Sequence, residues 1–543
     1  MNFDEILCII GGFGKFQKIL YVWICLPQIF LAFHMLVSVF TGAVPPHLCR
    51  STWPSAGTPD SMNFSFLNPA DDQPKFSCST PLNHSSAASH GDGHRAGSCK
   101  GGWEYSNKTF QSTIVTEWDL VCDSASLNNM GSSIYMFGLL VGAIVFGSLA
   151  DKYGRRFIIL VNLAIQVVFG VGAAFAPNFY VYTALRFIVG TSVSGVIMNA
   201  FVLGTEWTGS KERMLAGIIT DYFFGFGYIL LAGVAYLIRD WRRLQLAISA
   251  PGFLFIFYIW VLPKSARWLM ANDRKEEAWE LLQKAAQMNG KLLTKDLEMS
   301  EVQLQHMYKN EEKTEQKKKH SFIDLVRTPK MRKQSLIVFY LWFVNVLVYY
   351  GLSLNISDFG MNIYLTQMIF GLVEMPARTI TLFTLNRSRK ISQLAFLTVG
   401  GTACLLTIFI PSDMSVIKTV LAMIGKFGIT ASLSIIYVYS AEVFPTVIRQ
   451  NGIGIGSMCA RTGGVLAPMM YLLRNISPQA PMVLCGLCPL LGSALTLLLP
   501  ETANKPLPDT IEDIEGSSLS EADGGAKVVI FGTPLRNAST RMD

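Results

Sequence analysis

Charged residues are scarce in this 543-residue sequence. Lys, Arg, Asp and Glu together account for 15% of it, whereas hydrophobic residues account for 51%. Soluble domains are about 25% charged, so this composition argues against a purely cytosolic protein. The sequence also lacks the G-x-x-x-x-G-K-S/T loop that binds nucleotide phosphates, and its His and Cys residues lack the spacing of a zinc site. We therefore expect no ATP hydrolysis, no enzyme activity, no cofactor and no resident metal.

The apolar residues fall into twelve long runs. A helix needs about 20 apolar residues to cross a bilayer, and a single run could instead belong to a soluble core, but twelve could not. The sequence therefore predicts an all-α membrane protein with twelve transmembrane helices. The runs lie near residues 20–40, 129–150, 157–176, 181–201, 215–238, 244–262, 335–353, 363–385, 392–410, 416–438, 453–473 and 481–500.

Two long polar segments set the expected orientation. Residues 264–333 hold 16 basic and 11 acidic side chains, whereas residues 41–128 hold 5 basic and 8 acidic ones. Loops rich in Lys and Arg stay in the cytoplasm, so the net charge of +7 is a topology signal rather than a sign of nucleic-acid binding. The predicted parts are a cytoplasmic segment at 1–19, a six-helix half at 20–262 with the extracellular loop 41–128, a cytoplasmic loop with short helices at 263–334, a second six-helix half at 335–500, and a disordered cytoplasmic tail at 501–543.

The first polar loop carries signs of an oxidising, extracellular environment. It contains four cysteines, which suggest two disulfides, and the sequence leaves all three possible connectivities open. It also contains three Asn-x-Ser/Thr sites for glycosylation. The cysteines are Cys49, Cys78, Cys99 and Cys122, and the glycosylation sites are Asn63, Asn83 and Asn107.

Charged residues recur at matched positions in the two predicted halves. A Gly-Arg-Arg sequence follows the second helix, a Glu with an Arg seven positions later follows the fourth, and similar groups recur in the second half. Two matched halves are the layout of transporters built from repeats. We expect these charges to clasp cytoplasmic helix ends and hold an inner gate shut, although topology anchoring alone would also place basic residues here. The expected gate residues are Asp151, Gly154, Arg155, Arg156, Glu206, Arg213, Arg389, Glu442 and Arg449.

Four stretches of sequence resemble a known family. Gly147-Ser-Leu-Ala-Asp151-Lys-Tyr-Gly154-Arg155-Arg156 is similar to the hallmark loop of the major facilitator superfamily. The chain resembles the organic-ion branch of this superfamily, solute carrier family 22, over residues 1–515. The stretches that carry this resemblance are Ser112-Thr-Ile-Val-Thr-Glu-Trp118-Asp119-Leu-Val-Cys122, Pro263-Lys-Ser-Ala-Arg267-Trp268-Leu and Ala441-Glu442-Val-Phe-Pro445-Thr-Val-Ile-Arg449. The resemblance implies the major facilitator fold of two six-helix halves in the plasma membrane, with both termini cytoplasmic. The family usually has Glu where Lys264 stands and Gly where Ser388 stands, and both departures concern the gate.

Ionisable residues inside the predicted helices include Arg186, Asp221, Glu374, Arg378, Lys426 and Arg461. Such charges need a partner or a wet cavity. We expect internal ion pairs at Arg186, Asp221 and Glu374, because opposite charges are available to them. The other three cations then share Glu374 alone, which predicts surplus positive charge at a cavity. Guanidinium groups there would bind oxyanions. The resemblance agrees, because the anion branch has Arg at the position of Arg461, where the cation branch has an acidic residue.

The sequence thus predicts a polyspecific organic anion transporter, monomeric, that takes up or exchanges amphipathic carboxylates, urate or sulfate conjugates by alternating access. The alternative is a zwitterion or cation carrier of the carnitine type, which keeps the same Arg. Expected partners are small organic anions, a counter-anion such as a dicarboxylate, and membrane lipid, but no nucleic acid. Aromatic walls around a few polar anchors would suit varied ligands. The expected substrate-binding residues are Arg461, Arg378, Tyr350, Tyr349, Tyr437, Trp342, Tyr222, Phe224, Tyr228 and Lys426.

Overall fold

The computed structural model describes residues 3–49, 78, 99, 101–209, 212–291, 323–411, 413–503, 505, 508 and 510–516. Within this part, ten helices are long and apolar enough to cross a membrane. They are α2 (Lys15–Leu36) with α3 (Ser38–Thr41), α5 (Ala125–Tyr153), α6 (Arg155–Ala174), α7 (Phe179–Glu206), α8 (Arg213–Leu237), α9 (Trp241–Ser249) with η2 (Ala250–Phe257) and α10 (Tyr258–Val261), α15 (Pro329–Leu354), α16 (Ile363–Leu385), α17 (Arg389–Leu406) with η5 (Thr407–Phe409), and α18 (Ser415–Val443).

The last two predicted membrane helices are shorter than expected. The eleventh run forms α19 (Arg449–Leu466), which contains Arg461 and then continues as the 3₁₀ segment η6 (Pro468–Asn475). The twelfth forms α20 (Ala480–Thr496), an apolar helix of 17 residues. Each of the twelve apolar runs therefore forms a helix, and the prediction of an all-α membrane bundle is confirmed. The boundaries differ from the prediction, since the first membrane helix starts at Lys15 rather than residue 20.

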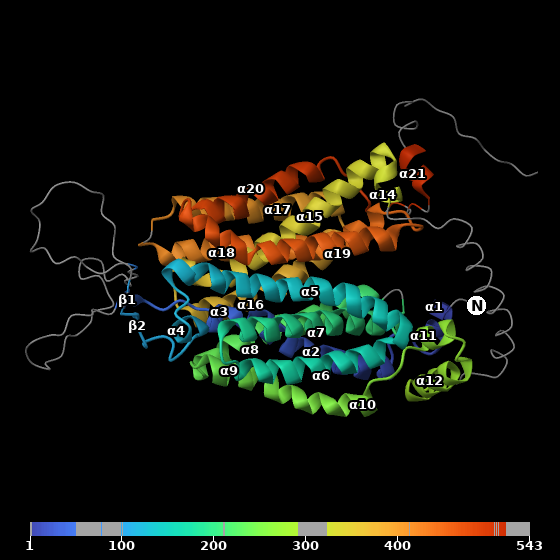
Figure 1. Ribbon diagram of the computed structural model, residues 1–543. Helices are drawn as coiled ribbons and strands as arrows, with labels where there is room; N and C mark the ends of the chain where they lie inside the picture. The colour runs from blue at the N-terminus through green and yellow to red at the C-terminus, as the bar shows by residue number, and fades with distance from the viewer. Residues whose placement is uncertain are drawn as a thin grey trace, which may run out of the picture.

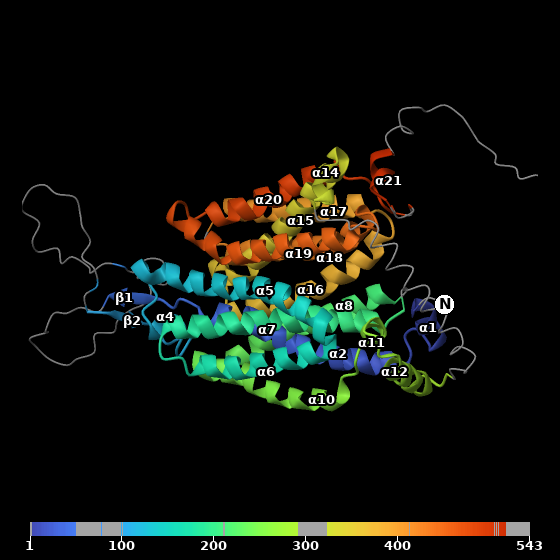
Figure 2. The same cartoon turned by 45° about the vertical axis from the view of Figure 1, so that its right-hand side comes forward.

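The helices form two halves that lie side by side (Figures 1 and 2). In the first half α7 packs against α5 and α6, and in the second half α17 packs against α18 and α20. Glycines permit close approach within each half: a Cβ at Gly138 of α5 would lie 2.5 Å from the Phe187 carbonyl oxygen of α7, and one at Gly428 of α18 would lie 2.7 Å from that of Phe396. Such small-residue contacts are typical of membrane helices. The largest contacts between the halves are those of α8 with α16 and of α5 with α19.

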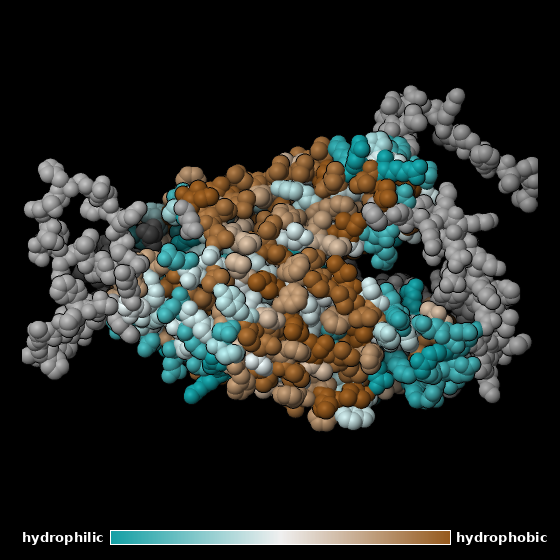
Figure 3. Space-filling view, viewed as in Figure 1, coloured by the Kyte–Doolittle hydropathy of each residue, from teal (hydrophilic) through white to brown (hydrophobic). Residues whose placement is uncertain are grey.

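Polar residues gather at both ends of the bundle, and apolar residues cover its middle (Figure 3). One end, which we call the disulfide end, carries α4 (Ile114–Glu117) and the antiparallel strands β1 (His47–Cys49) and β2 (Trp103–Tyr105). The opposite end, which we call the short-helix end, carries α1 (Phe3–Ile9), α11 (Ala266–Ala271), α12 (Lys275–Met288), α14 (Asp324–Arg327) and α21 (Ile511–Gly516). A hydrophobic belt between two polar caps is the surface expected of a membrane-spanning protein.

Part of the predicted disordered tail is folded. Helix α21 packs against α15, and Ile514 is buried. The Glu515 carboxylate accepts a hydrogen bond from the backbone N–H of Lys330, at 3.0 Å. The prediction of disorder is therefore wrong for residues 511–516, because an apolar contact and a helix N-terminus hold them. Residues 517–543 lie outside the described part of the chain.

The two halves close at the disulfide end. The ring of Tyr364, at the start of α16, stacks on that of Phe40 in α3 with centroids 5.4 Å apart, and it meets Tyr236 of α8 edge-on at 5.5 Å. The Tyr364 hydroxyl donates to the Thr109 carbonyl oxygen at 3.1 Å. At the short-helix end, in contrast, the molecule is hollowed between the halves (Figure 3). The bundle is thus closed at one end and open at the other.

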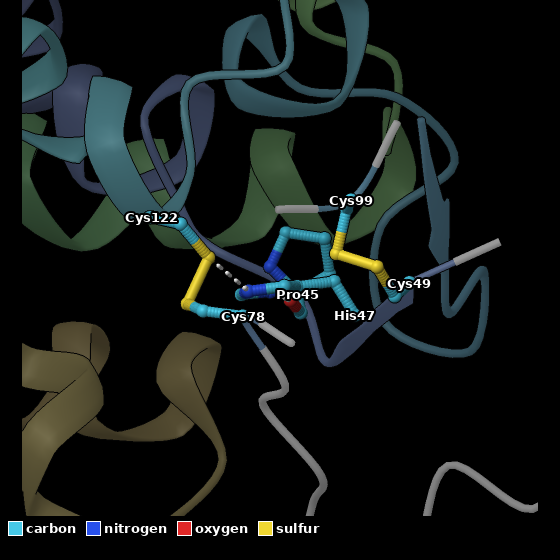
Figure 4. Close-up of a disulfide and its surroundings, with 6 residues drawn as sticks. All are labelled: Pro45, His47, Cys49, Cys78, Cys99 and Cys122. Atoms are coloured by element: carbon cyan, nitrogen blue, oxygen red, sulfur yellow. Dashed lines mark hydrogen bonds between the residues drawn. A yellow bond between two sulfur atoms is a disulfide. The ribbon is translucent and has the colours of Figure 1, made fainter. Parts of the chain in front are cut away.

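The disulfide end contains two cross-links around a buried histidine (Figure 4). Cys49 is bonded to Cys99, and Cys78 is bonded to Cys122. The Nδ1–H of His47 donates to the Pro45 carbonyl oxygen at 3.1 Å, and its Nε2 lies 4.0 Å from the Cys122 sulfur. Burial lowers the pKa of His47, which favours the neutral ring. Because both neighbouring sulfurs are in a disulfide, this group does not offer thiolates to a metal.

The predicted glycosylation sites fall in the same loop. Asn107 follows β2 and its side chain is exposed, which a glycan requires. Asn63 and Asn83 lie outside the described residues.

The pairing of the cysteines can be tested by mass analysis. In the Cys49→Ser variant, we expect one newly labelled thiol, at Cys99, because its partner is gone, while the peptide that joins Cys78 to Cys122 persists. Labelling of surface protein without reductant, followed by proteolysis, measures both. The wild-type protein, with none of the four labelled, is the control. A peptide that joins Cys49 to Cys78 or Cys122 in the wild type would contradict this pairing.

Candidate functional site

The charges that the sequence places inside membrane helices gather where the two halves meet. Glu374 and Arg378 lie one turn apart on α16 and so share a face of that helix. Lys426 belongs to α18 and Asp221 to α8 of the first half. Helix α16 packs against both α8 and α18. The contact between α8 and α16 therefore holds charged residues from both halves.

Glu374 is the acidic centre of this cluster, and its side chain is only 1% exposed. It accepts a hydrogen bond from the Tyr349 hydroxyl, and its carboxylate lies 3.1 Å from Lys426 Nζ and 3.7 Å from Arg378 Nη2. Lys426 is fully buried and also donates to Ser353 Oγ at 2.6 Å. The predicted contact of Lys426 with a substrate stays a prediction, and in this geometry the ammonium is enclosed and already neutralised.

Arg378 has a second acidic partner across the boundary between the halves. Its Nη1 forms an ion pair with Asp221 of α8, so the prediction that Arg378 shares Glu374 alone is wrong. The Arg378 side chain is 11% exposed and that of Asp221 is 43% exposed. Next to this pair, the hydroxyls of Tyr222 and Thr379 are hydrogen-bonded at 2.5 Å. Charged and neutral bonds thus join α8 to α16 at the same level.

Arg461 lies in the other contact between the halves. Its Nη1 donates to the Leu139 carbonyl oxygen of α5 at 3.2 Å and to Ser194 Oγ of α7 at 2.9 Å. Its Nε is buried without a hydrogen-bond partner in the structure. Among the described residues, no carboxylate lies within ion-pair distance of it. Arg461 is therefore a permanent cation held by neutral oxygen atoms.

Arg186 does not form the expected internal ion pair with any described carboxylate. Its Nη2 donates to the His34 carbonyl oxygen at 2.7 Å, and its Nη1 lies 3.4 Å from His34 Nδ1. The guanidinium also lies over the Tyr135 ring, 4.2 Å from the centroid. Arg186 is 3% exposed. The prediction failed because a carbonyl group and an aromatic face stabilise this cation inside the first half.

Three of the predicted aromatic wall residues are buried and pack within the protein: Trp342, Tyr228 and Tyr349. The Trp342 indole N–H donates to Ser440 Oγ at 2.8 Å. A Cβ at Gly456 would lie 2.9 Å from the Trp342 ring, so this glycine of α19 serves helix packing.

Four other aromatic residues keep part of their surface open. Tyr437 is 55% exposed, and its ring meets that of Trp342 with centroids 4.3 Å apart. Its hydroxyl lies within electrostatic range of Arg461, Arg378 and Asp221. Tyr350 is partly exposed and lies within range of Arg461, and Tyr222 and Phe224 on α8 are also partly exposed. Tyr437 therefore lies near both Arg461 and Arg378, and Tyr350 lies near Arg461.

The predicted gate residues form one ion-pair cluster in each half, at the short-helix end. In the first half, Arg155 lies 2.7 Å from Asp151 and 3.4 Å from Glu206. In the second half, Arg389 lies 3.0 Å from Glu442, and this pair corresponds to that of Arg155 with Glu206. Each cluster clasps neighbouring helices of its own half. The described ion pairs at this end thus do not latch one half to the other.

The remaining gate residues support helix ends. Gly154 has φ +90°, and a Cβ there would lie 3.3 Å from the Trp268 ring, so glycine suits this turn between α5 and α6. Arg156 donates to the Ile259 carbonyl oxygen. Arg449 donates to that of Phe444 at 3.2 Å. The side chain of Arg213 lies outside the described part of the structure.

The two departures from the family pattern each have a local partner. Lys264 Nζ lies 2.8 Å from Glu277, and hydrogen bonds from Lys264 and Arg274 lower the pKa of Glu277. Ser388 donates to Glu501 and accepts from the Ile391 N–H at 3.1 Å, which caps α17. Burial opposes ionisation of Glu501, yet the bonds from Ser388 and from backbone N–H groups lower its pKa. The side chains of Lys264 and Ser388, which differ from the family pattern, thus each bind a carboxylate within the protein.

Comparison with known proteins places these features in context. Residues 64–513 match the family model described as sugar (and other) transporter. The chain is 40% identical to the organic cation transporter protein of Drosophila melanogaster, over 95% of both chains. It is 39% identical to solute carrier family 22 member 6 of Bos taurus, over 95% of both chains, and 40% identical to member 13 of Homo sapiens, over 95% of this chain and 93% of that one.

The fold resembles that of solved transporters. An inward-open structure of the xylose transporter XylE from E. coli aligns with a TM-score of 0.56 at 17% identity, over 74% of this chain and 91% of that chain. A second structure of the proton:xylose symporter XylE, bound to 6-bromo-6-deoxy-D-glucose, aligns with a TM-score of 0.55 at 19% identity, over 73% and 90%. The predicted major facilitator fold is therefore confirmed.

The role of Glu374 can be measured as stability. We expect Glu374→Gln to lower the free energy of unfolding by about 3–5 kcal/mol, because it leaves Lys426 as a buried, unpaired cation. Thermal unfolding of the detergent-purified protein checks this. The double variant Glu374→Gln with Lys426→Met removes both charges and should recover most of the loss. A single variant as stable as the wild type would contradict the central role of this carboxylate.

Proposed function

Since the chain belongs to the sugar (and other) transporter family and, within it, to solute carrier family 22, we propose that it is a polyspecific organic anion transporter that works by alternating access. The observation that carries this proposal is the environment of Arg461. A guanidinium held by neutral oxygens at the contact between the halves can bind a carboxylate, sulfate or urate-like anion through two parallel hydrogen bonds.

The balance of charge favours anions over cations. The two acids Asp221 and Glu374 neutralise the two bases Arg378 and Lys426. Arg461 then adds a net positive charge to the region around Tyr437. A cation carrier, which is what the relative from Drosophila is named, would need a free carboxylate beside the substrate. A zwitterion carrier of the carnitine type would need one as well. Asp221 is engaged with Arg378, which favours the anion carrier.

The proposed orientation places the disulfide end outside the cell and the short-helix end, with both termini, in the cytoplasm. Disulfides form in oxidising surroundings, Asn107 is exposed for glycosylation, and the loop 264–333 is rich in basic residues. The bundle is then open to the cytoplasm and closed outside around Tyr364. We place this monomer in the plasma membrane, where it exchanges an external organic anion for an intracellular carboxylate.

The two ion-pair clusters would act when the cytoplasmic end closes. Each now clasps one half, Arg155 with Glu206 and Arg389 with Glu442. Rocking of the halves about the central site would bring the clusters toward each other. Basic residues of one cluster would then pair with acidic residues of the other, and these ion pairs would stabilise the outward-open state.

The anion site is tested by Arg461→Asp. We expect loss of organic anion uptake at unchanged surface level, because the substitution places a carboxylate where the substrate carboxylate would bind. Uptake of a labelled panel (urate, nicotinate, a prostaglandin, a steroid sulfate and an organic cation) measures it. Arg461→Lys keeps the charge without the planar fork and should retain part of the activity. Wild-type anion uptake by the Asp variant would overturn the assignment of Arg461.

The gate is tested by Glu442→Gln. We expect a lower maximal rate with a modest change in half-saturation, because a partly buried ion pair contributes on the order of 1 kcal/mol to one state and its loss shifts the populations toward inward-open. Labelling of cytoplasmic cysteines should rise in parallel. Glu280→Gln, which breaks an exposed pair with Lys284 on α12, is the matched control. An unchanged rate and unchanged labelling would leave these charges as topology anchors only.

A further inference from the structure

The ion pair between Asp221 and Arg378 joins residues 157 positions apart, from α8 and α16. The Asp221 side chain is 43% exposed, although it neutralises a cation that is only 11% exposed. Glu374, the other acid near Arg378, is 3.7 Å away and also serves Lys426 and Tyr349. Asp221 is therefore the close counter-ion of Arg378, and it reaches Arg378 from a partly open position.

Arg378 would otherwise be a second anion site. Its guanidinium and that of Arg461 both lie within electrostatic range of the hydroxyl of Tyr437, a side chain that is half-exposed. Two guanidinium groups near one half-exposed tyrosine would suit an anion with a carboxylate at each end. In this chain, however, one of the two guanidinium groups is already bound by a carboxylate of the protein.

We propose that Asp221 is a specificity-determining residue: it occupies Arg378 as an internal carboxylate, so that the transporter selects organic monoanions over dianions. This inference rests on the proposed function and deepens it. The second carboxylate of a dianion would have to displace Asp221 and would then lie beside it and Glu374, where like charges repel. The intracellular counter-anion is, for the same reason, a monocarboxylate rather than a dicarboxylate.

A matched pair of substrates tests the proposal in the wild-type protein. Glutarate is a dianion and monomethyl glutarate is a monoanion of nearly the same shape, so uptake of the two labelled compounds compares charge alone. A charged hydrogen bond is worth enough to change affinity by about tenfold or more. We therefore expect wild-type protein to prefer monomethyl glutarate by about tenfold. A wild-type preference for glutarate would overturn the proposal without any variant.

The variant Asp221→Asn keeps the shape of the side chain and removes its charge. We expect the ratio of glutarate uptake to monomethyl glutarate uptake to rise by about tenfold, because Arg378 becomes available to the second carboxylate. Asp221→Asn combined with Arg378→Gln should return the ratio to the wild-type value. Asp273→Asn is the control, since Asp273 is 91% exposed in its side chain, has φ +60° and lies at the short-helix end.

The possible outcomes distinguish a failure of the role of Asp221 from a failure of the proposed function. If wild-type protein carries monomethyl glutarate and Asp221→Asn leaves the ratio unchanged, the role of Asp221 is wrong and the proposed function stands. If wild-type protein carries carnitine and Asp221→Asn loses that uptake alone, Asp221 binds cations and the proposal is also wrong. If no variant carries any organic anion at normal surface level, the proposed function fails and this inference fails with it.

Discussion

A charge inside a membrane must be neutralised or kept in contact with water. In the second half, Glu374 provides negative charge for both Lys426 and Arg378. It binds Tyr349 of α15 and Lys426 of α18, and it lies one turn from Arg378 on its own helix. Three helices therefore share one carboxylate, and their packing around the site depends on it. With Lys426 satisfied in this way, Arg378 is left to interact with Asp221 in the first half.

The contacts within each half differ in kind from the contacts between the two halves. Within each half, glycine contacts and ion-pair clusters fix the helices. Between the halves, close packing such as that of Gly371 against Tyr228 is joined by polar bonds, such as those of Arg461 with Leu139 and Ser194. In the proposed mechanism, a bound anion would compete for these polar bonds, so binding and movement would involve the same side chains.

Composition and periodicity predicted the helices well, because a run of about 20 apolar residues has few alternatives to a membrane helix. They also identified six charged residues inside the helices, but not His34, which is buried in α2. The partners could not be predicted, because the ion pair of Arg378 joins residues 157 positions apart and the sequence gives no register between α8 and α16. Arg186 was assigned a carboxylate and instead binds His34 and Tyr135, since a sequence does not show where carbonyl groups and ring faces lie. The folded α21 was missed for a similar reason, as its stability comes from α15.

The two ends of the bundle close by different chemistry. At the disulfide end the contact is a stack of aromatic rings around Tyr364, whereas at the short-helix end the available groups are ions such as Arg155 and Glu442. Apolar contacts weaken on cooling, and salt screens ion pairs, partly buried ones less than exposed ones. If the proposed gate acts, cooling favours opening of the aromatic end, while a rise in ionic strength favours opening of the charged end. Temperature and salt would then be two separate controls on which end of the bundle is open.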